Sequence, residues 1–134
     1  MDISSFDDLL AAARQQPQPQ RLLFAFAHAE LPEDATAEQR AAFEAGHGGA
    51  LVPAVCVDKT LEELTTFEAF IEESRGFSLD WVIVFAASLS GRDGQLPSAA
   101  EAEAPLQKMV ASIKAGNIDA FIPFNRQGEP VRLG

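Results

Sequence analysis

Residues 66–89 constrain the fold most, because a helix pattern there runs directly into a strand pattern. In the first part, apolar residues such as Phe67 and Ile71 recur at helical spacing, and glutamates occupy the positions between them. This spacing predicts an amphipathic helix with one buried face. Residues 81–87 are then apolar without polar alternation, which is typical of a strand covered on both faces. We therefore predict a central strand there.

The predicted helix has signals at both ends. Thr60 with Glu63 three residues later has the spacing of a capping box, in which each side chain bonds to the other residue's backbone N–H. Arg75 and Gly76 are typical of a helix end. Two further pairs have the capping-box spacing: Thr36 with Gln39, and Ser98 with Glu101. We therefore expect helices to begin at all three pairs.

The same order of patterns occurs in the N-terminal half of the chain. The matching segments are residues 5–27 with 66–87, and residues 45–53 with 115–123. These matches predict an internal αβαβ duplication with pseudo-repeats at residues 4–59 and 65–129. The alternative is that a chain rich in alanine and leucine matches itself by chance.

Prolines divide the predicted strands into two kinds. The strands are residues 21–27, 50–57, 81–87 and 119–124. The second contains Pro53 and the fourth Pro123, and proline favours a sheet edge or a bulge because it cannot donate a ladder hydrogen bond. We predict a single α/β domain over residues 1–134. Its mixed four- to five-stranded sheet has the order 2-1-3-4 with a C-terminal hairpin strand and packs with about four helices.

Charge and cysteine content exclude several classes of function. Twenty acidic and ten basic residues give a net charge of −10, so no basic face is expected to bind nucleic acid or an anionic membrane. No stretch approaches the ~20 apolar residues of a membrane span, and no export signal is expected. The single cysteine, Cys56, lies between two valines, so we expect it to be largely buried in a cytoplasmic protein.

Motifs for catalysis, metals and cofactors are missing from the sequence. The soft metal ligands are His28, His47 and Cys56, and no two of them have the spacing of a metal site. The chain also lacks the nucleophile elbow and the glycine-rich phosphate-binding motifs. We therefore expect no catalytic residue, no metal and no cofactor.

Four polar residues near the ends of the two central strands are candidates for a small-ligand site. His28 and Glu30 follow the first of these strands, and Ser90 and Arg92 follow the second. Ligands collect at strand ends in open α/β sheets, but only parallel central strands would bring the four residues together. The alternative for His28 is a structural histidine held by hydrogen bonds. Residues 91–94 could form a turn that binds an anion, and the alternative there is a plain connecting turn.

Three segments of the chain carry a resemblance to a known family. The run Leu-Leu-Phe-Ala-Phe-Ala at residues 22–27, together with residues 50–59 and 67–75, resembles an uncharacterised family of short proteobacterial proteins commonly labelled "ribonucleotide reductase subunit alpha". The resemblance covers nearly the whole chain. The label does not imply reductase activity, because that chemistry needs a radical-bearing cysteine, a reducing cysteine pair and a large barrel. One cysteine and 134 residues cannot supply them.

These observations favour a non-catalytic protein-interaction or regulatory module. The alternative is a small-ligand-binding protein or minor enzyme with its site at the ends of the two central strands. Residues 50–57 carry no charge, and an edge strand presents N–H and C=O groups that another chain can pair with. We expect a homodimer through this strand. The competing partner is a different, basic protein that adds a strand there.

Overall fold

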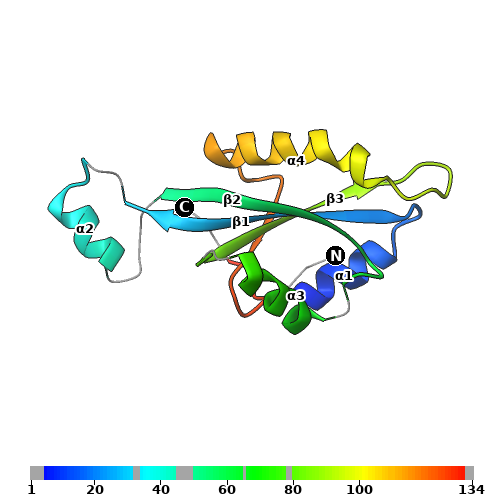
Figure 1. The fold of residues 1–134 in the computed structure, drawn as a ribbon, viewed down its shortest axis with the longest axis horizontal. Helices are drawn as coiled ribbons and strands as arrows, with labels where there is room; N and C mark the ends of the chain where they lie inside the picture. The colour runs from blue at the N-terminus through cyan, green and yellow to red at the C-terminus, as the bar shows by residue number, and fades with distance from the viewer. Residues whose placement is uncertain (1–4, 32–33, 45–49, 65, 78–79, 132–134) are drawn as a thin grey trace.

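Helices and strands alternate along the chain in this computed structural model, which describes residues 5–31, 34–44, 50–64, 66–77 and 80–131 (Figure 1). The elements are α1 (Phe6–Arg14), β1 (Gln20–Glu30), α2 (Ala37–Glu44), β2 (Ala50–Thr60), α3 (Phe67–Ser74), a short 3-10 helix (Arg75–Phe77), β3 (Ile83–Ser90), α4 (Ala99–Lys114) and β4 (Ile122–Phe124). No helix in the described ranges is both long enough and apolar enough to cross a membrane.

The four strands form one sheet with the order β2-β1-β3-β4, which confirms the predicted order. Each neighbouring pair is antiparallel, so the sheet is not mixed. The reason is the crossover after β2. Helix α3 carries the chain back along the sheet, so β3 starts at the same end as β2 and both run against β1.

Both prolines lie in edge strands, as predicted. At Pro53 the register with β1 also shifts, because Phe26 pairs with Val55 and Ala27 pairs with Pro53. Ala54 is therefore the extra residue of a β-bulge. The start of the predicted C-terminal hairpin is present: the N–H of Asn125 donates to the Glu129 carbonyl and the N–H of Val131 to the Pro123 carbonyl, both at 3.0 Å. Residues 132–133 lie outside the described residues.

The core has two parts, one on each face of the sheet. Helices α1 and α3 cover one face, and α4 covers the other (Figure 1). The first part contains Phe6, Leu9, Leu10, Ala13, Leu22, Phe24, Phe26, Leu64, Phe70, Trp81, Val84, Ala86 and Phe124. The second contains Leu23, Ala25, Ala27, Ile83, Phe85, Ala102, Met109 and Ile113. Alternate residues of β1 face opposite sides, which explains why residues 22–27 are all apolar.

Helix α3 begins later than its pattern predicts. The Thr60 box forms, since the Thr60 N–H donates to Glu63 Oε1 at 2.9 Å and the Glu63 N–H donates to Thr60 Oγ1 at 3.2 Å. The hydrogen bond from the Thr60 N–H to the Glu63 carboxylate lowers the pKa of Glu63. The box closes a single turn after β2, however, and Thr66 caps α3 by accepting from the Ala69 N–H at 3.1 Å. The other two predicted boxes stand at the starts of α2 and α4.

All four strands have different bounds from those predicted. β2 extends to Thr60, and β4 begins only at Ile122 because residues 119–120 are in a turn. β1 continues through Glu30, which pairs with Ala50, so His28 and Glu30 stay in the sheet. β3 begins at Ile83, and the preceding Val82 is 40% exposed although its apolar run predicted a core position. An uninterrupted apolar run contains no polar residue that would mark such an exposed position.

Helix α2 marks the main difference between the two halves. Each half has the element order α-β-α-β, but α4 packs on the sheet whereas α2 lies beyond the end of the sheet (Figure 1). The end of α2 predicted at Gly46 lies outside the described residues. The duplication stays a prediction.

Candidate functional site

The four predicted ligand-binding residues lie in two separate pairs. In the antiparallel register of β1 and β3, Gln20 pairs with Ser90 at one end of β1, whereas His28 and Glu30 lie at the other. At ~3.3 Å per residue, His28 is roughly 26 Å from Gln20 along the strand. The structure therefore places Arg92 with Ser90 and does not bring the two pairs into one site.

His28 and Glu30 form a contact on the surface of the sheet. Nε2 of His28 lies 3.6 Å from Oε1 of Glu30, and the pair carries opposite charges only when the imidazole is protonated. The glutamate side chain is exposed, so solvent screens the interaction, which contributes ~0–1 kcal/mol. His47, the other histidine of the chain, lies outside the described residues.

The predicted turn after β3 is a tight hairpin. The N–H of Arg92 donates to the carbonyl of Gln95 at 3.1 Å, and the N–H of Gln95 donates to the carbonyl of Arg92 at 2.9 Å. The φ angles of Asp93 and Gly94 are 52° and 76°, as a type I′ turn requires. Gly91 has no room for a side chain, because a Cβ there would lie 2.0 Å from the Gln95 carbonyl oxygen.

Further hydrogen bonds fix this hairpin to the segment before β1. The N–H of Gly91 donates to the Pro19 carbonyl at 2.8 Å, and the N–H of Gly94 donates to Gln18 Oε1 at 2.7 Å. Most N–H groups of the turn are therefore bound to protein oxygens. This arrangement favours a connecting turn over an anion-binding one.

Two hollows lie beside the hairpin and share Leu96. The first has a volume of about 410 Å³ and is lined mainly by Leu89, Ser90, Arg92, Asp93, Leu96 and Glu101. The second has a volume of about 320 Å³ and is lined by Pro19, Gln20, Thr60, Leu61, Glu62 and Leu96. We call these two hollows the corner groove.

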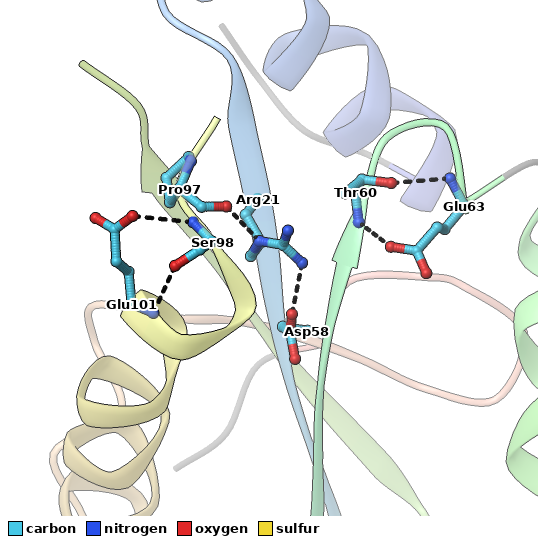
Figure 2. A network of polar contacts seen from close by, with 7 residues as sticks. All are labelled: Arg21, Asp58, Thr60, Glu63, Pro97, Ser98 and Glu101. Atoms are coloured by element: carbon cyan, nitrogen blue, oxygen red, sulfur yellow. Dashed lines mark hydrogen bonds and ion pairs between the residues drawn. The ribbon is translucent and has the colours of Figure 1, made fainter. Parts of the chain in front are cut away.

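Beside the groove, Arg21 of β1 joins three elements (Figure 2). Its Nη1 lies 2.6 Å from Oδ2 of Asp58 on β2, and its Nε donates to the Pro97 carbonyl at 2.7 Å. The side chains of Arg21 and Asp58 are only 12% and 24% exposed. Directly after Pro97, Ser98 and Glu101 form the capping box of α4 (Figure 2). The start of α4 is therefore held against β1 and β2.

Gln20 faces the side of the sheet opposite to Arg21 and forms hydrogen bonds with the polar residues there. It is 5% exposed, and its Nε2 donates to the Gln18 carbonyl at 3.0 Å and to Ser90 Oγ at 2.9 Å. Its Oε1 accepts from the Ser88 hydroxyl. The predicted ligand residue Ser90 thus already accepts a hydrogen bond within the sheet.

The charged groups of the corner groove differ in whether they already have a partner. Within the described residues, the side chains of Arg92, Asp93 and Glu62 have no hydrogen bond or ion pair, whereas Glu101 is engaged by Ser98. No group of three or more potential metal ligands gathers in the described ranges. The groove therefore offers apolar contact and charge.

Sequence reasoning missed three residues that shape this corner: Arg21, Asp58 and Leu96. Arg21 and Asp58 are 37 positions apart, and their contact depends on the pairing of β1 with β2. Leu96 did leave a signal, because it is a large apolar residue between a glycine turn and a helix cap. Such an isolated leucine in a polar connector is a reason to look for a surface contact.

Cys56 is half-buried in β2, where it packs against the second part of the core, so its predicted burial is partial. Burial raises the pKa of the Cys56 thiol, and the nearby Lys114 ammonium opposes this to a smaller extent. A raised pKa leaves little thiolate at pH 7, and thiolate is the reactive form.

We therefore expect a disulfide reagent to label Cys56 in the folded protein much more slowly than in the protein unfolded by guanidinium. The rate should rise as pH rises, and Lys114→Gln should slow it further at neutral pH. Labelling of folded protein at the unfolded rate would contradict this expectation.

Comparisons with protein-family models, with curated proteins and with solved structures find no match to this chain.

Proposed function

We propose that this protein is a non-catalytic protein-interaction module that forms a homodimer through the outer edge of β2. The observation that carries the proposal is the position of this strand. β2 is 11 residues long and pairs with β1 on one side only within the described part of the chain. Its residues 50–57 carry no charge. A long edge strand that is uncharged over residues 50–57 is a template for pairing with another chain.

A second copy of this chain is the partner that the features of β2 favour. Two β2 strands related by a twofold axis can pair antiparallel and cover both edges at once. The bulge at Ala54 and the missing N–H of Pro53 interrupt the edge, which disfavours open-ended polymerisation. The competing partner is a basic protein that adds a strand at the same edge.

We also propose a cytoplasmic location, which the single cysteine and the unpaired thiol support. We also propose that the chain belongs to the short proteobacterial family that residues 22–27, 50–59 and 67–75 resemble. It adds no reaction to the proposal.

The test of self-association is the mass of the protein in solution. Light scattering at micromolar concentration should give twice the 14.4 kDa of one chain. Because each copy has a net charge of −10, the copies repel, and added salt should strengthen the dimer by screening. Binding of a basic partner would weaken with salt instead.

Ala54→Lys is the variant that tests the interface. Ala54 is exposed at the bulge, so a lysine there leaves the core intact but places a charge on the edge. Val55 is less suitable, because it packs against the first part of the core. The matched control is Ala104→Lys on the exposed side of α4. We expect Ala54→Lys to be monomeric and Ala104→Lys to stay dimeric. A wild-type protein that is monomeric at all concentrations would refute the proposal.

A further inference from the structure

We propose that the corner groove binds an extended segment of another protein in which a leucine-sized apolar side chain is flanked by lysine or arginine. This goes beyond self-association, because the groove reaches β2 only at its last residue, Thr60, and involves neither Pro53 nor Ala54. Leu96 supplies the apolar contact, and the carboxylates around it select the basic flanks.

The apolar part of the argument rests on the exposure of Leu96. Among the described residues, only Val82 and Leu96 are large hydrophobic residues classed as exposed, and Leu96 is 39% exposed. Leu96 lies where the hollows of about 410 Å³ and 320 Å³ meet. Exposed single leucines are common on proteins, but one that borders two hollows can be enclosed by a partner side chain on each side.

The segment that carries Leu96 is already fixed in place. On one side, the hairpin is bonded to Pro19 and Gln18. On the other side, Arg21 holds the Pro97 carbonyl at 2.7 Å, next to the capped start of α4 (Figure 2). A fixed surface loses little conformational entropy when a partner binds. The leucine is therefore held in an exposed position that a partner can use.

The charges around Leu96 favour a basic partner. Asp93, Glu101 and Glu62 line the two hollows, against the single guanidinium of Arg92. Arg21 adds no free positive charge, because Asp58 pairs with it. This excess of carboxylates, in a chain with a net charge of −10, attracts cations and repels another acidic copy of the same chain. A basic segment of a different protein is the occupant that fits.

The experiment is an amide chemical-shift titration of the ¹⁵N-labelled full-length protein with the blocked peptide Lys-Leu-Lys-Leu-Arg. Two matched peptides serve as controls. Glu-Leu-Glu-Leu-Glu tests the need for basic residues, and Lys-Ser-Lys-Ser-Arg tests the need for leucine. We expect only the first to bind, with shifts confined to residues 19–20, 60–62 and 89–101, which line or border the two hollows. Affinity should fall as salt rises from about 0.05 M to about 0.5 M, because exposed charges are then screened.

The protein variants make the test specific. Leu96→Ala should weaken binding about tenfold or more, as loss of a central apolar contact does. Val82→Ala removes the other large hydrophobic residue that is exposed among the described residues; it lies just before β3, at the end away from the groove, and should bind like the wild type. The monomeric Ala54→Lys variant should also bind the peptide, which separates this proposal from that of the homodimer. Absent shifts, shifts elsewhere, equal binding of the acidic peptide, or unchanged binding by Leu96→Ala would each overturn it.

Discussion

Replacing Phe85 with alanine is expected to lower the free energy of unfolding by about 3–5 kcal/mol, the cost of truncating a buried phenylalanine. Phe85 is fully buried in β3, on the face that α4 covers. Its backbone neighbours are Ala25 of β1 and Pro123 of β4, so strands flank it on both sides. Surrounding elements cannot move in to fill the cavity that the missing ring leaves. Equilibrium denaturation in urea or guanidinium measures the change.

Val82→Ala is the matched control, because Val82 belongs to the same apolar run as Phe85. It is 40% exposed and lies before the first residue of β3. A large part of its surface stays in water in the folded protein, so we expect a loss below about 1 kcal/mol. A Phe85→Ala loss below about 1 kcal/mol, or equal losses in both variants, would mean that the centre of the sheet is assigned incorrectly.

These two residues show how far a hydrophobic pattern can predict a fold. Prolines placed β2 and β4 at the edges, and two apolar runs placed β1 and β3 at the centre, so the strand order was readable. Strand direction could not be predicted, because a continuous apolar run is the same whether the strand pairs parallel or antiparallel with its neighbour. The start of α3 was missed because Thr60–Glu63 and Thr66 are both valid caps, and the choice depends on how far β2 extends.

The candidate site was predicted less well than the fold. Ser90 and Arg92, at and just after the end of β3, line the first hollow, and their role as ligand-binding residues stays a prediction. His28 and Glu30 were grouped with them only under the condition that the central strands are parallel, and the register excludes that condition. The residues that fix the corner are distant in sequence, as Arg21 and Pro97 show with their separation of 76 positions. Contacts of this kind follow from strand pairing and not from local spacing.

The second large effect is expected at Trp81, the only tryptophan of the chain. It is fully buried, and its Nε1 donates to the Ser74 hydroxyl at 3.0 Å. Its ring makes an edge contact with Phe26 at 5.0 Å between centroids, and the guanidinium carbon of Arg126 lies 5.3 Å from its centroid. Trp81→Ala should cost about 3–5 kcal/mol, because it removes both the packing and the donor.

Smaller changes at Trp81 separate these contributions. Trp81→Phe keeps an aromatic ring but removes the N–H, and Ser74→Ala removes its acceptor. Each should cost about 1–3 kcal/mol, because a buried polar group loses its partner. Ser74 also donates to the Ile71 carbonyl at 2.6 Å. Ser74→Ala therefore removes two hydrogen bonds and should cost more than the single hydrogen bond that Trp81→Phe removes. The double variant should lose less than the sum of the single losses, because both remove the same bond.

Arg126→Met completes the series, since it removes the cation over the ring but keeps most of the side chain. Arg126 is 41% exposed, so the expected loss is only ~0.5–1 kcal/mol. Fluorescence of the single tryptophan provides an independent measurement, because a buried indole emits at shorter wavelength than one in water. The emission should move to longer wavelength at the same denaturant concentration at which the helical circular dichroism is lost. Emission typical of a solvent-exposed indole in the folded protein, or a Trp81→Phe variant as stable as the wild type, would contradict the buried Trp81–Ser74 contact.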